Sequence, residues 1–224
     1  MAKKKLLHFA ENLTFKHLFQ YPNQGLLSDF PLKGKWHTGY FQNDNPATLE
    51  LGCGKGEYTV NLALNHPERN FIGMDIKGAR LWKGCKMVEE LGLKNVAFIR
   101  SRVEFLESFF AGNEVEEIWL TFPDPQPQSN RMQKRLTSPE FLERYKNILK
   151  PQGIIHLKTD NDSLYIYTLG VIREYGHFPV FSSEDIYRLD TFHEATTIQT
   201  FYEDIYRKEG MPIKYIEFKL NYAG

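Results

Sequence analysis

LELGCGKG, residues 49–56, is an apolar run that ends in glycines at positions 52, 54 and 56. Glycine at every second position lets the backbone turn sharply and lets a ligand approach main-chain N–H groups without Cβ atoms in the way. The spacing differs from the Gly-x-Gly-x-x-Gly of dinucleotide sites, and no Gly-Lys-Ser/Thr of a P-loop follows. Because the carboxylate of Glu50 would repel a phosphate, the sequence disfavours a pyrophosphate ligand and an NAD(P)-dependent oxidoreductase.

Strand-like and helix-like segments alternate around this turn. Apolar runs predict strands over residues 47–53, 71–76, 96–101, 117–122 and 153–159, and helical spacing predicts helices over 56–65, 78–91, 103–110 and 139–149. Such alternation implies a parallel sheet covered by helices on both faces. A further helix is predicted over 162–175 and strands over 178–183 and 213–220. The last strand alternates apolar and polar residues, which is typical of an antiparallel addition with one exposed face.

The composition fits a folded domain in a reducing compartment. The chain has 224 residues, 42% of them hydrophobic, and its two cysteines, Cys53 and Cys85, are too few for a disulfide framework or a Cys-rich zinc site. The apolar run after Lys3–Lys5 is too short for a secretory signal, and no stretch approaches the roughly 20 apolar residues of a membrane span. We therefore expect a cytoplasmic protein with no membrane contact and no metal.

Residues 1–45 differ from the rest and are expected to form an irregular basic and aromatic arm on a domain of residues 46–224. Phe9, Phe15 and Phe19 of the arm either stack on bases or pack on the core, and we favour the core. Equal numbers of basic and acidic residues, 28 each, give a net charge of zero, which taken alone argues against a nucleic-acid partner. The basic residues nevertheless gather in the arm, at Lys3, Lys4, Lys5, Lys16, Lys33 and Lys35, and in residues 126–150.

Asp75 closes the strand that follows the glycine turn. Parallel strands end at one edge of a sheet, so the Asp75 carboxylate is expected beside the turn, where it suits the two hydroxyls of a ribose. A glycine turn and a strand ending in Asp together resemble motifs I and II of the class I S-adenosylmethionine-dependent methyltransferases. The resemblance implies a Rossmann-like α/β fold with a seven-stranded, mostly parallel sheet and an antiparallel last strand. It also implies that Glu50, Gly52, Gly54, Asp75 and Arg102 bind the cofactor, with Arg102 near the adenine.

A proline-rich turn, FPDPQP, ends the strand predicted over 117–122. Prolines fix φ, so Asp124 between two of them is expected to be held beside the reacting group; the alternative is an ordinary solvated turn. The basic side chains of Arg131, Lys134 and Arg135 follow this turn. Asp160 ends the strand over 153–159 at the same edge, and Thr200-Phe201-Tyr202-Glu203 lies in a long segment before the last strand. Long segments at such an edge are commonly functional.

The order FPDP, a basic stretch, Lys-Thr-Asp and Thr-x-x-Glu resembles the bacterial tRNA (guanine-N7-)-methyltransferases from about Phe9 to the C-terminus. This implies transfer of a methyl group from S-adenosylmethionine to N7 of the variable-loop guanosine, position 46, of tRNA. Asp124 would be catalytic and contact the cofactor. The target nucleoside would meet Gln128, Asp160, Thr200, Phe201, Tyr202 and Glu203, and the RNA would meet Arg131, Lys134 and Arg135. The expected partner is tRNA, with either a monomer or a homodimer as the functional form.

Three positions depart from that family. Gln126 and Gln128 replace a tryptophan and a substrate-binding lysine, and Arg102-Val103 replaces Asp-Ala, which removes an acid that would accept from the adenine amino group. N7 of guanine carries a lone pair and no proton, so the transfer needs alignment and charge stabilisation and not a general base. The alternatives are a methyltransferase for another RNA or a small molecule, and a non-catalytic RNA-binding module.

Overall fold

The computed structural model describes residues 2–22, 30–189 and 193–222. Its eight strands are β1 (Leu18–Gln20), β2 (Ala47–Leu51), β3 (Asn70–Asp75), β4 (Val96–Arg100), β5 (Val115–Thr121), β6 (Leu149–Thr159), β7 (Phe178–Ser183) and β8 (Lys214–Lys219). Its helices are α1 (Ala2–Glu11), α2 (Glu57–Asn65), α3 (Gly78–Leu91), α4 (Pro139–Lys146), α5 (Asp162–Glu174) and α6 (Phe201–Lys208). Short turns of 3-10 or π-helix are η1 (Trp36–Phe41), η2 (Val103–Ser108), η3 (Ser129–Lys134), η4 (Ile186–Arg188) and η5 (Glu194–Thr196).

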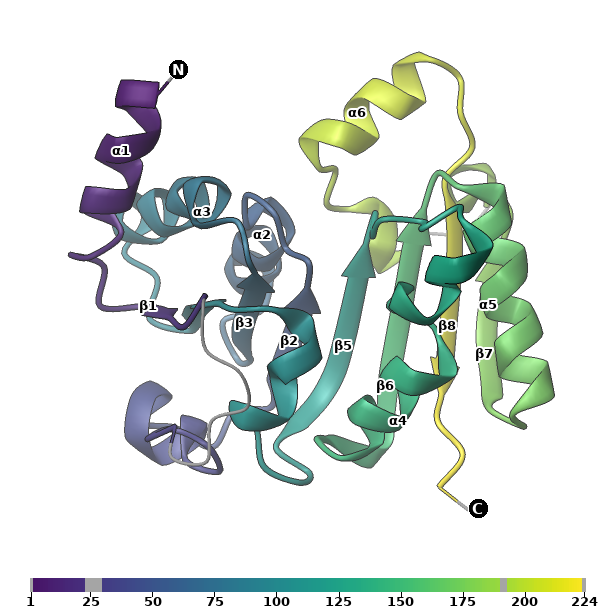
Figure 1. Ribbon diagram of the computed structural model, residues 1–224, viewed down its shortest axis with the longest axis horizontal. Coiled ribbons are helices and arrows are strands. Elements are labelled where there is room, and N and C mark those ends of the chain that lie inside the picture. The colour runs from purple at the N-terminus through teal and green to yellow at the C-terminus, as the bar shows by residue number, and fades with distance from the viewer. Residues whose placement is uncertain (1, 23–29, 190–192, 223–224) are drawn as a thin grey trace.

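All eight strands form one sheet in the order β1-β4-β3-β2-β5-β6-β8-β7 (Figure 1). Strands β1 to β6 pair in parallel, whereas β8 runs antiparallel to both β6 and β7. The α/β fold with an antiparallel last strand is therefore confirmed. The sheet has one strand more than predicted because the three residues of β1, at its edge, come from the N-terminal segment.

Two apolar layers cover the two faces of the sheet. One contains Tyr58 and Leu62 of α2 with Leu81 of α3, and the other contains Leu142 of α4 with Leu164 of α5. The central strands between them are the most deeply buried; all residues of β2 and β3 are buried. This burial on both faces explains why these strands are continuous apolar runs.

The N-terminal segment is more regular than expected. It contains α1, β1 and η1, and its aromatic side chains Phe15, Phe30, Trp36 and Phe41 are buried in the core. Phe15 and Phe19 pack on the core, while the ring of Phe9 lies 4.7 Å from the Arg100 guanidinium. The segment thus shares the sheet and the core of the rest of the chain.

Candidate active site

The glycine turn joins β2 to α2 in a conformation that requires glycine. Gly52, Gly54 and Gly56 have φ values of 75°, 56° and 70°, a region that L-residues with a side chain rarely adopt. A Cβ at Gly56 would lie 2.6 Å from the Phe98 ring, whereas one at Gly52 would have no neighbour nearer than 3.9 Å. The third glycine therefore serves packing, and the first opens the main chain toward a pocket.

Asp75, at the end of β3, is tied to this turn as predicted. Its carboxylate accepts hydrogen bonds from the backbone N–H of Gly54 at 3.0 Å and of Lys77 at 2.7 Å. A carboxylate has about four acceptor positions, so these two bonds leave Asp75 able to accept from a ligand. The carboxylate is oriented by the main chain on both sides.

Glu50 is buried directly below the turn, with 2% of its surface exposed. Its carboxylate accepts from the backbone N–H of Thr59 at 2.8 Å and from the hydroxyl groups of Thr59 and Thr121. Burial raises the pKa of Glu50 to about 7, although the hydrogen bonds from Thr121 and Thr59 oppose that shift. Glu50 thus joins β2, α2 and β5 beneath the turn.

The proline-rich turn after β5 has a strained backbone at two positions. Phe122 and Gln126 have φ values of 49° and 44°, and non-glycine residues in this region are often found at functional sites. Between them, the exposed Asp124 accepts from the backbone N–H of Gln126 at 3.0 Å. Among the residues that the structure describes, the Asp124 carboxylate has no basic partner and is held by its own turn.

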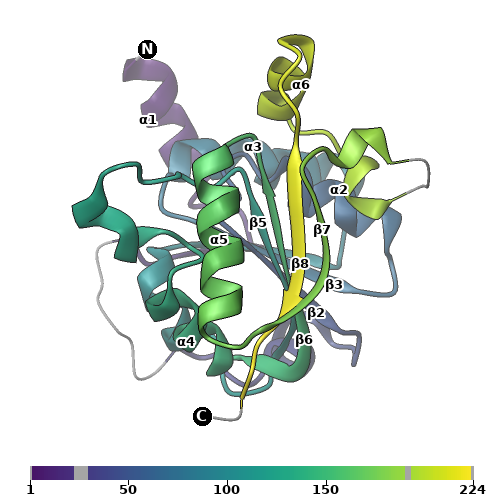
Figure 2. The ribbon, with the colours of Figure 1, turned by 90° about the vertical axis from the view of Figure 1, so that its right-hand side faces the viewer.

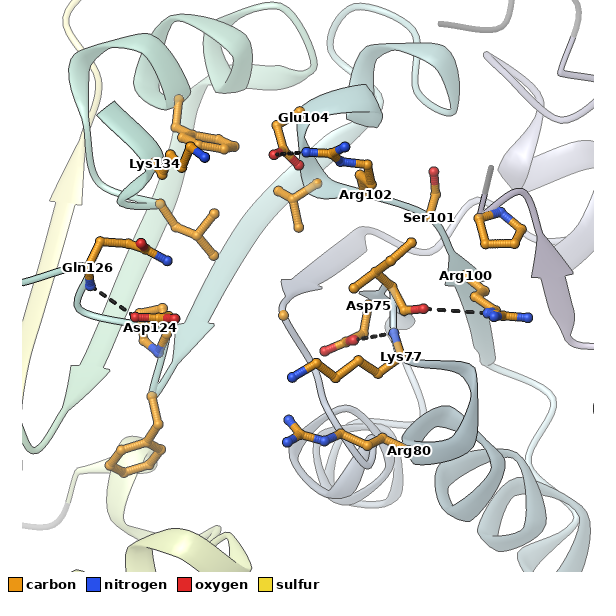
Figure 3. A pocket seen from close by; sticks show the side chains of 18 of the residues that line it. Asp75, Lys77, Arg80, Arg100, Ser101, Arg102, Glu104, Asp124, Gln126 and Lys134 are labelled. Atoms are coloured by element: carbon orange, nitrogen blue, oxygen red, sulfur yellow. Dashed lines mark hydrogen bonds and ion pairs between the residues drawn. The ribbon is translucent and has the colours of Figure 1, made fainter. Parts of the chain in front are cut away.

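A pocket of about 930 Å³ lies between these groups (Figure 3). Asp75, Lys77 and Arg80 come from β3 and α3 on one side, and Asp124, Gln126 and Lys134 face them from the other (Figure 3). Further lining residues are Gly52, Arg100, Ser101, Arg102, Glu104, Phe122, Arg131, Tyr202 and Tyr206. A smaller cavity of about 90 Å³ shares Gly52, Arg80, Phe122 and Tyr202 with it and is also lined by Glu50, Gly54 and Thr200. Residues predicted from distant parts of the chain are therefore brought together.

The structure corrects the prediction for Arg135. Its side chain is 7% exposed, and the guanidinium donates to the carbonyl oxygen of Pro125 at 3.0 Å and of Gln126 at 3.2 Å, with the Tyr167 ring 4.3 Å away. Arg135 therefore holds the proline-rich turn instead of facing RNA. Arg131 and Lys134 are exposed, and their contact with RNA stays a prediction. Gln128 is exposed but does not line the pocket.

The structure also corrects the prediction for Glu203. This side chain is completely buried and lies 2.6 Å from the ammonium of Lys158, and Tyr187 donates its hydroxyl to it at 2.7 Å. The carboxylate is thus engaged away from the pocket. Phe201 is exposed and does not line the pocket, whereas its neighbour Tyr202 does.

Asp160 lies at the end of β6, just outside the residues that line the pocket. Burial raises the pKa of Tyr206, and the negative charge of Asp160 contributes to the shift. Asp160 is therefore close to the Tyr206 side of the pocket. Four residues that line the pocket were missed as site residues: Lys77, Arg80, Phe122 and Tyr206. Phe122 is the first residue of the FPDP motif, Lys77 stands two positions after Asp75, and Tyr206 lies one helical turn after Tyr202, so proximity to a motif was the available signal.

A metal site and a membrane-spanning helix were both expected to be absent, and the described residues bear on each. Within residues 2–22, 30–189 and 193–222, no three His, Cys, Asp or Glu side chains gather as metal ligands. None of the helices in the described ranges has both the length and the apolar character needed to cross a bilayer.

Comparisons with known proteins agree with the methyltransferase-like arrangement of this pocket. A family model described as "Putative methyltransferase" matches residues 44–216. A tRNA (guanine-N(7)-)-methyltransferase of Christiangramia forsetii is 53% identical over 98% of this chain and 99% of the relative. Another protein of that name, from Bacteroides thetaiotaomicron, is 48% identical over 100% of this chain and 88% of the relative.

Solved structures show the fold at much lower identity. The crystal structure of the 16S rRNA methyltransferase KamB matches with a TM-score of 0.63 and 15% identity, over 88% of this chain and 95% of that one. At this identity the match supports the fold alone, and the assignment rests on the sequence relatives. With 53% identity along nearly the whole of both chains, the protein belongs to the tRNA (guanine-N(7)-)-methyltransferase family.

Proposed function

We propose that this enzyme transfers a methyl group from S-adenosylmethionine to N7 of the variable-loop guanosine, position 46, of tRNA. The observation that carries the proposal is the composition of the pocket. The glycine turn, Asp75, the Asp124 turn and two tyrosines of α6 line it, and the exposed side chains of Arg131 and Lys134 lie at its edge. Such a pocket suits a nucleoside cofactor, a flat base and a phosphate backbone at once.

The residues present fit the cofactor. The main chain at Gly52 has open space where a Cβ would stand, Asp75 has free acceptor positions for two ribose hydroxyls, and Ser101 presents a buried hydroxyl with no hydrogen-bond partner among the described residues. We place the ribose at Asp75, the adenine beside Ser101 and Arg102, and the methionine end at Glu50, Gly52 and Gly54. S-adenosylmethionine supplies a methyl group on a positively charged sulfur.

The protein's part in the reaction is orientation and electrostatics. N7 of guanine needs no deprotonation, and the base becomes cationic as it is methylated, so a nearby carboxylate and aromatic rings stabilise the product-like charge. We assign the carboxylate to Asp124 and the rings to Phe122, Tyr202 and Tyr206. To Asp160 we assign the role of accepting from the N1 and N2 donors of the guanine. Arg131 and Lys134 would contact phosphates.

A substrate with a single altered atom tests the function. Purified enzyme and cofactor are incubated with unmodified tRNA that carries guanosine or 7-deazaguanosine at position 46, and the methylated position is mapped. We expect 7-methylguanosine in the first tRNA and no methylation of the second. Methylation elsewhere in the tRNA, or transfer only to another RNA or a small molecule, would overturn the proposal.

Binding of S-adenosylhomocysteine by calorimetry separates cofactor binding from catalysis. We expect Asp75→Asn to weaken that binding at least about tenfold, which corresponds to loss of a charge-assisted hydrogen bond. Unchanged binding by this variant would show that Asp75 does not bind the ribose.

The two cysteines are free and buried. We propose a cytoplasmic location, where tRNA is found.

A further inference from the structure

Lys158 is a completely buried lysine at the carboxyl end of β6. Its ammonium donates to the carbonyl oxygens of Ala195 and Ile198, the latter at 3.1 Å, and lies 2.6 Å from the Glu203 carboxylate. All three acceptors belong to the segment between β7 and β8. One side chain of the central sheet therefore holds this segment at three points.

Glu203 connects the same lysine to α6. The helix begins with a capping box in which the Thr200 hydroxyl accepts from the Glu203 backbone N–H at 3.2 Å and the Glu203 carboxylate accepts from the Thr200 backbone N–H at 3.3 Å. The carboxylate that pairs with Lys158 thus also satisfies the first turn of α6. A change at Lys158 would act directly on the start of this helix.

α6 has no other deep anchor. Of its eight residues only Glu203 is buried, and Phe201 and Tyr202 are 52% and 44% exposed. An isolated helix of this length is not stable in water, so its orientation depends on its contacts with the rest of the chain, and the buried one is at its start. Figures 1 and 2 show α6 beyond the end of the sheet at which β5 and β6 finish.

The helix nevertheless carries side chains of the pocket. Tyr202 and Tyr206 line it, and the Tyr206 ring lies 5.9 Å from that of Phe122 in the proline-rich turn. At the start of α6, the Glu57 carboxylate accepts from the Phe201 backbone N–H at 3.1 Å, and the Lys55 ammonium lies 4.0 Å from the Phe201 ring centre. The helix therefore rests on the glycine turn at one point and on β6 at another.

A buried ion pair is a poor source of stability, because desolvation offsets much of the attraction, but it fixes geometry. We propose that the Lys158–Glu203 pair is a positioning device that sets α6, and with it Tyr202 and Tyr206, against the target guanine. Lys158 and Glu203 are positioning residues that do not touch the substrate. The inference rests on the proposed function, since it names what orients the base side of that site.

Hydrogen exchange and binding test the inference without methyl transfer. In Lys158→Met we expect amides of residues 200–208 to exchange at least about tenfold faster, because the anchor is lost, while S-adenosylhomocysteine affinity stays within about twofold. The control is Lys150→Met, an exposed lysine on the same strand paired with Glu116, which should leave both unchanged. A folded Lys158→Met protein with unchanged exchange in α6 would overturn the proposal.

Lys158→Met leaves the buried Glu203 carboxylate unpaired, and this single variant could fail to fold for that reason. A double variant then supplies the test. Lys158→Met with Glu203→Gln buries no charge, and glutamine still completes a capping box. We expect this protein to fold, to exchange faster in α6 than the wild type, and to show a raised KM for tRNA with little change in cofactor affinity. Wild-type exchange in α6 would refute the positioning role.

An altered substrate distinguishes positioning from direct contact. Inosine lacks the N2 amino group of guanosine, so a direct contact of Glu203 with that group would make the inosine penalty disappear in Lys158→Met with Glu203→Met, which has no acceptor at position 203. Positioning predicts that the penalty in kcat/KM is the same in both proteins within about twofold. Loss of the penalty in the variant would refute it. Failure of the wild type to methylate tRNA would instead refute the proposed function and leave the exchange result valid.

Discussion

At Glu50 the protein keeps a carboxyl group in a place where its charged form is unfavourable. The group is shielded from water, and burial raises its pKa to about 7, against 4.5 for the free side chain. The native state therefore binds a proton more tightly than the unfolded state between these two pH values. Linkage requires that the contribution of Glu50 to stability is largest at low pH and is lost as the pH rises through this window.

We predict that Glu50→Gln removes this dependence. Between pH 5 and pH 8, the wild type should lose roughly 2 to 3 kcal/mol of unfolding free energy relative to Glu50→Gln. The amide can still accept from Thr59 and donate to a threonine hydroxyl, so the variant should fold. Urea denaturation at both pH values, without cofactor, measures the difference. Parallel pH profiles in the two proteins would contradict the raised pKa.

Asp124 permits a substitution that changes charge and little else. Its Oδ1 accepts from the Gln126 backbone N–H, a bond that asparagine retains. We predict that Asp124→Asn lowers the single-turnover rate of methyl transfer at least about tenfold, because a stabilising charge beside the cationic base is lost. Asp44→Asn, on the surface outside the pocket, is the control. A rate within about twofold of the wild type would remove Asp124 from the reaction.

The segment η3 and the residues after it contain basic side chains with different environments. Lys134 is exposed at the pocket, whereas Arg135, the next residue, is buried against the proline-rich turn. Sequence alone cannot separate the two, since the difference arises from the carbonyl groups of Pro125 and Gln126 and from the Tyr167 ring.

We predict that substitutions of Lys134 and Arg135 change different properties of the enzyme. Lys134→Ala should reduce the slope of log affinity for tRNA against log salt by up to about one unit and leave kcat nearly unchanged. Arg135→Met should leave the slope unchanged and lower kcat, because the turn that holds Asp124 loses its clamp. Filter binding at several salt concentrations, together with steady-state kinetics, distinguishes them. A reduced slope in Arg135→Met would return this arginine to the RNA-contacting set.

Predictability differed between elements for identifiable reasons. β3 and β4 match the predicted strands closely because apolar runs reveal buried strands, and β7 also matches although most of its residues are exposed. The helix predicted over 103–110 is the 3-10 helix η2 instead, with Phe105 at φ −106° and ψ 17°. α6 is missing from the predicted elements, although Tyr202, Ile205 and Tyr206 follow Phe201 at helical spacing, because the segment before the last strand is expected to be a loop.

The residues of the functional site also differ in how far local sequence patterns predict them. The glycine turn and Asp75 are set by local spacing and by the common edge of parallel strands, so their proximity could be predicted. The location of Glu203 could not, because it depends on Lys158, a lysine buried in a strand. Buried charges of this kind form pairs that sequence patterns do not reveal.

At the scale of the whole molecule, the zero net charge conceals two groups of residues. Acidic side chains such as Glu50, Asp75 and Asp124 lie at the pocket or beneath it, and exposed basic side chains lie at its rim and on the N-terminal segment. Net charge therefore describes solubility better than it describes the partner.

Deletion of the N-terminal segment would not test its contact with tRNA, because the deletion also removes part of the fold. Without residues 1–45 the sheet loses β1 and the core loses Trp36, which is completely buried and donates to the Phe109 carbonyl oxygen at 2.9 Å. We predict that the truncated chain fails to fold, whereas replacing the exposed Lys16 and Lys35 by alanine preserves the fold and lowers the salt slope of tRNA binding. Circular dichroism and salt titrations check both. An unchanged slope would remove these lysines from the interface.

The pairing of β1 with β4 also affects how the protein is made. Leu18 is matched with Phe98 in the sheet, so β1 leaves the ribosome 80 residues before its partner. At roughly 5 to 20 residues per second, β1 waits about 4 to 16 seconds during synthesis before it can join the sheet. The first strand synthesised is therefore among those that cannot dock until later segments exist, and its apolar residues are exposed to chaperones in the meantime.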